Sequence, residues 1–108
     1  MVLKPGDILI REGEQSNQLY WIMHGELKAF KTINGLEVEL NRLKEGDLVG
    51  ELSFLDQRPR SATIKAVKET QLLVLEYEDY QQMLKDQPKW MKKILFTLTT
   101  KIRKLSEL

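Results

Sequence analysis

The spacing of apolar positions over residues 4–76 predicts short strands separated by tight turns. Residues 18–24 form an aromatic and apolar run that fits a buried strand, and residues 62–67 and 71–75 fit a later pair of strands. Strands this short, interrupted this often, are typical of an antiparallel barrel or sandwich. We therefore expect a mainly β architecture for the first three quarters of the chain.

The pair Asn34-Gly35 is the strongest hairpin signal in the sequence. A type I′ turn needs positive φ at both central residues, and asparagine and glycine tolerate this best. Directly afterwards, Leu36, Val38 and Leu40 alternate with polar residues. This alternation predicts a half-buried strand that returns along its neighbour.

Helical spacing replaces the strand pattern in the last quarter of the chain. Residues 78–86 fit one helix, and Pro88 is well placed as the first residue of a second helix that runs towards Leu108. The second helix has a basic face and an apolar stripe with a/d-like spacing over about two heptads. The stripe consists of Met91, Leu95, Leu98, Ile102 and Leu105. It could pack against the barrel or form a dimer seam. Alternatively, the helix could provide a lid over the base of a ligand, for which the candidates are Trp90, Phe96, Thr97, Thr99 and Thr100.

The length and composition describe a globular protein with one core. A chain of 108 residues is the usual size of a single domain, so we expect one domain over residues 1–108. Hydrophobic residues make up 42% and charged residues 31%, and the net charge is +1. A balance this even argues against a general nucleic-acid or membrane-surface binder, which usually carries a strong basic excess.

The residue types present also exclude several kinds of chemistry. Without cysteine there is no disulfide and no thiolate zinc site, and His24 is the single histidine, so we expect no metal site and no cofactor. A phosphodiesterase would need metal ligands or a nucleophile with its base, so we expect no enzyme. No apolar run reaches the ~18 residues of a transmembrane helix, and the N-terminus lacks a signal-peptide pattern. We therefore expect a cytoplasmic protein.

Residues 46–63 contain the parts of a site for a small phosphate ester. Gly50 lets the backbone approach a ligand closely, and residues 51–55 suffice for one helical turn whose first N–H groups lack partners inside the helix. Pro59 stiffens the approach to Arg60, whose planar guanidinium can donate two parallel hydrogen bonds to phosphate oxygens. The carboxylate of Glu51 is a strong acceptor for a ribose hydroxyl.

This segment resembles the phosphate-binding cassette of the cyclic-nucleotide-binding domain family, of the catabolite-activator and protein-kinase-A regulatory-subunit type. The matching residues are Gly46-Asp47-Leu48-Val49-Gly50-Glu51-Leu52-Ser53-Phe54-Leu55 and Pro59-Arg60-Ser61-Ala62-Thr63. Residues 5–13 and 19–25 resemble the opening strands of that family and their glycine turns. The resemblance covers roughly residues 4–90 and implies an antiparallel, jelly-roll-like β-roll over about residues 4–76. A short phosphate-binding helix and two C-terminal helices over about residues 77–108 complete the fold.

The resemblance implies a role for each residue of the expected site. Arg60 would bind the exocyclic phosphate oxygens, and Glu51 would bind the ribose 2′-hydroxyl. Backbone amides would complete the cradle, and the whole expected ligand-binding set is Gly50, Glu51, Leu52, Ser53, Arg60, Ser61 and Ala62. The ligand would be cAMP or cGMP, and Ser61 fits either.

The sequence departs from the family at several places. Val49 stands where a phenylalanine is common, which we expect to affect packing only. In the catabolite-activator branch a threonine and a serine of the last helix contact the base, and counting from Pro88 these places are Leu105 and Ser106. The missing threonine puts that way of reading adenine in doubt. No helix-turn-helix follows, so we expect no direct nucleic-acid contact.

These observations favour a cyclic-nucleotide sensor that relays binding through its C-terminal helices to an effector domain or partner outside this chain. The alternative is a ligand-free interaction or dimerisation module on the same fold. In either case a homodimer could form through the helix at residues 88–108.

Overall fold

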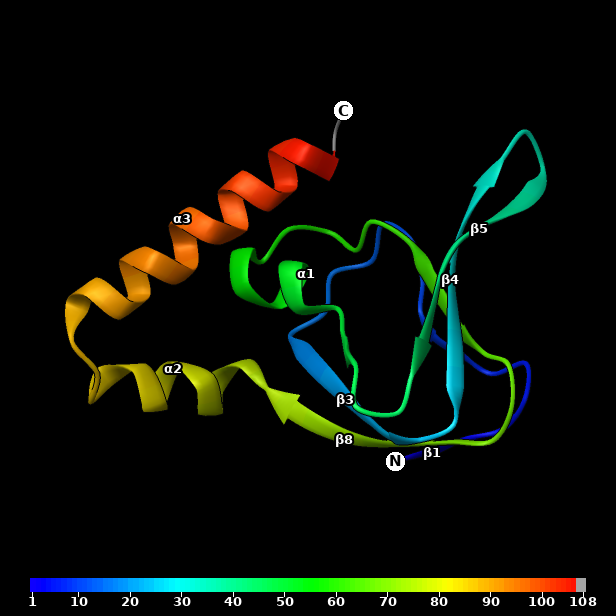
Figure 1. Ribbon diagram of the computed structural model, residues 1–108, viewed down its shortest axis with the longest axis horizontal. Helices are drawn as coiled ribbons and strands as arrows, with labels where there is room; N and C mark the ends of the chain where they lie inside the picture. Colours follow the sequence, from blue (N-terminus) through cyan, green and yellow to red (C-terminus); the bar gives the residue numbers. More distant parts are fainter. Residues whose placement is uncertain (107–108) are drawn as a thin grey trace.

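The strands form two four-stranded sheets that face each other (Figure 1). The computed structural model describes residues 1–106. The first sheet has the order β1 (Val2–Leu3), β8 (Thr70–Glu76), β3 (Gln18–His24) and β6 (Leu48–Val49). The second has the order β2 (Ile8–Ile10), β7 (Thr63–Ala66), β4 (Glu26–Ile33) and β5 (Leu36–Lys44). All pairings are antiparallel, so the prediction of an antiparallel β-roll is confirmed.

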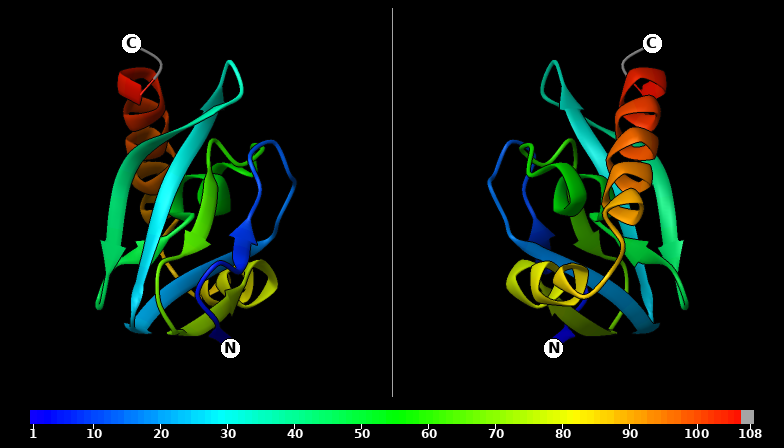
Figure 2. Two further views of the ribbon diagram at one scale, coloured as in Figure 1. Left: turned by 90° about the vertical axis from the view of Figure 1, so that its right-hand side faces the viewer. Right: turned by 90° about the vertical axis from the view of Figure 1, so that its left-hand side faces the viewer.

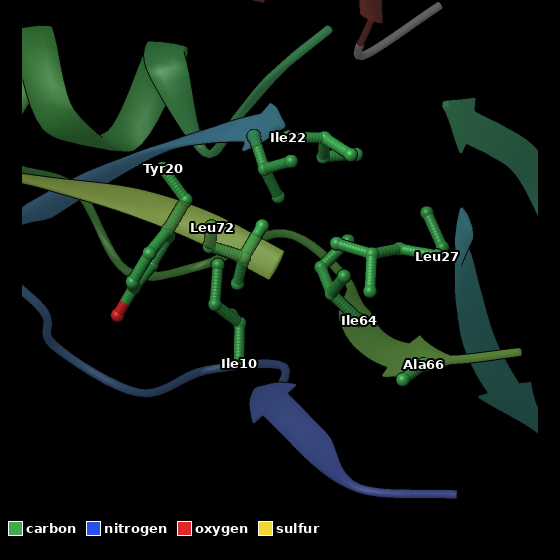
Figure 3. Packing of buried hydrophobic residues seen from close by; sticks show 9 residues of the cluster. Ile10, Tyr20, Ile22, Leu27, Ile64, Ala66 and Leu72 are labelled. Carbon is green, nitrogen blue, oxygen red and sulfur yellow. The ribbon is translucent and has the colours of Figure 1, made fainter. Parts of the chain in front are cut away.

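The core lies between the two sheets, and its buried cluster is built from strand residues (Figure 3). Ile22 of β3 and Leu27 of β4 are completely buried. In β3 the side chains alternate, so Tyr20 is buried whereas the next residue, Trp21, is 42% exposed. The cluster consists of Ile10, Tyr20, Ile22, Leu27, Ala29, Val49, Ile64, Ala66 and Leu72.

The β4–β5 hairpin forms as the sequence predicts, but the apolar residues of β5 are not buried as predicted. Asn34 and Gly35 have φ values of 52° and 78°, the positive values that the turn requires. Leu36, Val38 and Leu40 are 70%, 40% and 52% exposed, so the prediction of a half-buried strand is wrong for this stretch. The reason is position: β5 is the edge strand of its sheet, and the hairpin tip extends past the other strands (Figure 2).

Helices make up the rest of the described chain: α1 (Glu51–Asp56), α2 (Tyr77–Lys85) and α3 (Lys89–Ser106). Pro88 lies directly before α3, close to its expected place at the helix start. Phe54 of α1 contacts the rings of Tyr77 and Tyr80, with ring centroids 5.5 and 5.2 Å apart, and so attaches α2 to α1. None of the helices within residues 1–106 is both long and apolar enough to cross a membrane.

Much of the apolar stripe of α3 is exposed to solvent. Helix α3 contacts α1 (Figure 1), and Thr99 of α3 is only 2% exposed. Leu98 and Leu105 are 52% and 70% exposed, whereas Leu95 is partly buried. The stripe is therefore buried along one side only.

Candidate functional site

A cavity of about 270 Å³ opens between α1, the start of β7 and the interior of the roll. Every residue of the expected ligand-binding set lines it: Gly50, Glu51, Leu52, Ser53, Arg60, Ser61 and Ala62. The remaining wall is largely apolar and includes Ile10, Ala29, Leu43, Val49 and Ile64. The fold therefore gathers one fixed cation, one carboxylate and an apolar surface around a single hollow.

Arg60 is a buried arginine with its guanidinium held by main-chain carbonyls. It is 3% exposed and comes from the loop between α1 and β7. Its Nη1 donates to the carbonyl of Gly50 at 2.9 Å, and its Nη2 donates to the carbonyl of Gln18 at 2.5 Å and to Ser16 Oγ at 2.8 Å. These acceptors come from the N-terminal end of α1 and from the segment that leads into β3, so they fix the position of the positive charge.

One donor of Arg60 remains unused. Its Nε is buried and has no hydrogen-bond partner within the described part of the chain. Burial lowers the pKa of the Arg60 guanidinium, although Tyr20 and Glu14 act in the opposite direction, and an arginine stays protonated at neutral pH. A buried N–H without an acceptor costs roughly 1–3 kcal/mol, and more in a charged group. An anion in the adjoining cavity could supply the acceptor.

Gly50 is required by the position of the guanidinium. Its φ is 79°, which favours glycine, and a Cβ built there would overlap Nη1 of Arg60. The sequence suggested a glycine that makes room for a ligand. The structure adds that this glycine makes room for the arginine of the site itself.

The other polar residues of the cavity differ in exposure. Glu51 is the first residue of α1 and its side chain is exposed, so its carboxylate is available as an acceptor. Ser53 is 5% exposed. Its hydroxyl donates a hydrogen bond to the carbonyl of Pro59 at 3.4 Å and accepts one from Arg103 Nη2 at 3.0 Å. Ser53 thus links the cavity wall to α3.

Sequence reasoning missed several residues that shape this site. Ser16 and the carbonyl of Gln18 hold Arg60, but a polar loop gives no signal for such a role. Arg103 is one of the basic residues of the last helix predicted from the sequence. Its guanidinium contacts Asp56 and Ser53 of α1, and the sequence gives no signal for this contact.

A larger hollow of about 560 Å³ lies between α2 and α3. Tyr77, Tyr80, Leu84, Leu95 and Phe96 are among its lining residues. Arg60 and the cassette residues Gly50–Ser53 lie elsewhere, in the wall of the smaller cavity. The larger hollow therefore has none of the phosphate chemistry expected from the sequence, and the smaller cavity is the candidate site.

Comparison with known proteins agrees with this geometry. The family model described as "Cyclic nucleotide-binding domain" matches residues 1–87. The chain is 37% identical over 84 residues to the cyclic AMP receptor protein of Thermus thermophilus, an alignment that covers 77% of this chain and 39% of the receptor. The chain thus spans well under half of that relative.

Solved structures show the same fold. The catabolite activator protein of Thermus thermophilus superposes with a TM-score of 0.79 at 31% identity, covering 98% of this chain and 50% of that one. The cAMP-bound regulatory domain of protein kinase A from Toxoplasma gondii superposes with a TM-score of 0.73 at 33% identity, covering 76% of this chain and 31% of that one. With its β-roll, its cavity and these likenesses, the chain belongs to the cyclic nucleotide-binding domain family, a family of regulatory ligand-binding domains.

Proposed function

We propose that this chain is a cyclic-nucleotide sensor that binds cAMP or cGMP in the cavity lined by Gly50–Ser53 and Arg60–Ala62. The observation that carries the proposal is the buried guanidinium of Arg60, which is fixed by carbonyls and keeps its Nε–H without an acceptor. A cyclic phosphate carries one negative charge, which matches the one fixed cation in the wall.

The proposed roles follow from the chemistry of each group. Arg60 would donate to the exocyclic phosphate oxygens, with backbone amides of Leu52, Ser53, Ser61 and Ala62 completing the cradle, and Gly50 would keep the cradle open. Glu51 would accept the hydrogen bond of the ribose 2′-hydroxyl, because its carboxylate is exposed beside the cavity. The apolar part of the wall would pack against the sugar and the base.

The regulatory output would leave the roll through its helices. Helix α1 carries Glu51 and Ser53 of the cavity and is in contact with both α2 and α3. A ligand shifts a conformational equilibrium only as far as it binds the two states differently, so α1 is the element through which binding would act. The sensor performs no chemistry on its ligand. The effector would be another part of the protein or a partner, as the short coverage of the relatives suggests.

Calorimetric titration of the protein with cAMP and with cGMP tests the proposal. We expect micromolar or tighter binding, roughly −8 kcal/mol, for at least one nucleotide. Arg60→Ala should abolish or greatly weaken this binding, whereas Arg58→Ala, at an exposed arginine of the same loop, should leave it unchanged. The ratio of the two wild-type affinities gives the base preference.

Because Arg60 is buried, its replacement can also disturb folding, so a second variant is needed. Glu51→Ala removes an exposed side chain and should leave thermal unfolding unchanged while weakening binding by roughly tenfold or more, the value of a hydrogen bond to a charged group. A 2′-deoxy nucleotide should bind wild type and Glu51→Ala with equal affinity. Absence of binding to a folded, nucleotide-free wild-type sample would instead favour the interaction-module alternative.

We also propose that two copies associate through the helix of residues 88–108, of which residues 107 and 108 lie outside the described part. Trp90, Ile94, Leu98 and Leu105 of α3 are between 48% and 70% exposed. Their spacing places them on one face of the helix, opposite the face that contacts α1. A face of this kind is suited to pair with a second copy of itself.

A further inference from the structure

Arg103 makes the most extensive polar contact between α3 and the wall of the candidate site. Its Nε donates to Asp56 Oδ2 at 2.7 Å and its Nη2 donates to Asp56 Oδ1 at 3.2 Å, a forked arrangement on the last residue of α1. Both side chains are only 11% exposed. An ion pair shielded this well is screened by salt far less than a surface pair, and its forked geometry fixes the relative position of the two helices.

The same guanidinium also contacts a residue of the cavity. Nη2 of Arg103 donates to Ser53 Oγ at 3.0 Å, and Ser53 lines the hollow beside Gly50 and Arg60. The Ser53 hydroxyl in turn lies near the carbonyl of Pro59, the residue before Arg60. A continuous polar path therefore runs from α3 through Arg103 and Ser53 to the loop that carries the site arginine.

We propose that Arg103 is a positioning residue for the candidate ligand site: by holding Asp56 and Ser53 it orders the α1 wall, raises cyclic-nucleotide affinity, and makes the placement of α3 depend on ligand. This inference rests on the proposed function and assigns its coupling to a single side chain. By reciprocity, a contact that raises affinity when formed must itself be favoured when ligand is bound.

An effect of Arg103 through its charge alone predicts a different result from an effect through positioning of the α1 wall, so the two can be distinguished by experiment. If Arg103 acted only by adding positive potential near an anion, Arg103→Gln would weaken binding, whereas Asp56→Asn would strengthen it because it removes a negative charge. If Arg103 positions the wall, either substitution breaks the same forked contact. Both variants should then weaken binding.

The experiment is calorimetric titration with the nucleotide that wild type binds better. We expect Arg103→Gln and Asp56→Asn each to lose roughly fivefold or more in affinity, within the usual range for coupled sites. The double variant should be no weaker than the weaker single variant, because the two substitutions remove one interaction. Lys104→Gln, an equal charge change at the neighbouring exposed residue, should bind like wild type. Stronger binding by Asp56→Asn, or unchanged affinity in Arg103→Gln, would overturn the proposal.

A measurement without ligand separates this inference from the proposed function. Amide hydrogen exchange in nucleotide-free Arg103→Gln should be faster than in wild type along α3 and α1, while β3 and β8 keep their protection. Unchanged exchange along α3 would show that Arg103 does not hold the helix and would refute its positioning role. Failure of wild type to bind either nucleotide would refute the proposed function and the effect on affinity, whereas faster exchange would still support the anchoring of α3 by Arg103.

Discussion

Arg60 shows how a single residue can prepare a site for an anion. Among residues 1–106 the acceptors of the buried guanidinium are carbonyls and a hydroxyl, with no carboxylate, and they orient the charge without cancelling it. A carboxylate at hydrogen-bond distance would compete with a phosphate for the same donors. The arrangement therefore keeps a positive charge in place, while the buried Nε–H has no acceptor in the described part of the chain.

Gly50 provides a test of how closely the arginine is seated. Gly50→Ala should destabilise the protein and weaken nucleotide binding. The new methyl group would overlap Nη1 of Arg60, and the alanine would have to adopt an unfavourable positive φ. Gly46→Ala is the matched control, since its φ is 91° but no atom lies within 4 Å of its Cβ. The loss in free energy of unfolding should exceed that of the control by about 1–3 kcal/mol in denaturant titrations. Equal losses in the two variants would mean that backbone strain alone, and not overlap with Arg60, accounts for the destabilisation.

The lowered pKa of the Asp56 carboxyl determines how the contact between α1 and α3 should depend on pH. Burial by itself raises the pKa of Asp56, but hydrogen bonds from the Arg103 side chain and the Arg58 amide outweigh it and bring the pKa below its ordinary value of 3.8. The folded state thus binds this proton less readily than the unfolded chain. The stabilising effect of the carboxylate is therefore complete above its unfolded pKa and is lost as the pH falls through the lower folded value.

Comparison of wild type with Asp56→Asn measures this effect. At neutral pH the difference in free energy of unfolding should be about 1–3 kcal/mol in favour of wild type. It should shrink only at acidic pH, once the pH falls below the ordinary pKa of 3.8 and passes through the lower folded pKa. A difference that stays constant across this range would show that the Asp56 charge is not what stabilises the helix contact.

At the scale of elements, the β4–β5 hairpin shows that strand pattern and strand burial are separate matters. Both strands alternate in sequence, yet Leu27 of β4 is completely buried while Leu36 of β5 is 70% exposed. The difference comes from where each residue lies along the hairpin, because the base packs on the opposite sheet and the tip extends past it (Figure 2). Apolar residues at the tip therefore contribute little to the core.

A matched pair of leucine substitutions measures this difference. Leu27→Ala should cost about 2–5 kcal/mol of unfolding free energy, because it removes buried methyl groups and leaves a cavity in the core. Leu36→Ala, in the same hairpin, should change stability by less than about 0.5 kcal/mol. Denaturant unfolding of both variants checks the prediction, and comparable losses would place the hairpin tip against an apolar surface in solution.

The same elements show what sequence could and could not predict. Asn34-Gly35 acts through local backbone geometry, which sequence encodes directly, so the turn was predicted, and α1 forms where the resemblance implies a short helix. That the expected residues bind a ligand stays a prediction, although all of them line one cavity. Arg103 could not be placed, because its role depends on which face of α3 meets α1. The contact joins Arg103 to Asp56 and Ser53, which lie far from it in the chain.

At the scale of the whole molecule, the protein has a β-roll with its own core and a separate helical layer attached at α1. The buried cluster is drawn from the strands, whereas α2 and α3 are held by the Phe54 ring contacts and by Arg103 (Figures 1 and 2). Helix α3 keeps a face rich in apolar side chains directed away from the roll. This face is the basis of the proposed homodimer.

Substitution at the centre of that face tests the association. Leu98→Lys should lower the average mass in sedimentation at concentrations where wild type is dimeric, because it places a charge in an apolar seam. Leu36→Lys, at an equally accessible leucine far from α3, should sediment like wild type. A wild-type mass that stays monomeric at every concentration would count against the dimer.

The independence of the β-roll core from α2 and α3 also bears on how such a protein can diversify. A substitution on the outer face of α3 changes no contact of the buried strand cluster, so it is not constrained by the folding of the roll. The cassette and the core can then be preserved by selection while the helical layer acquires new partners. One ligand-reading unit could in this way be joined to many different outputs during evolution, with only the few side chains at the α1–α3 contact left to keep the two parts in communication.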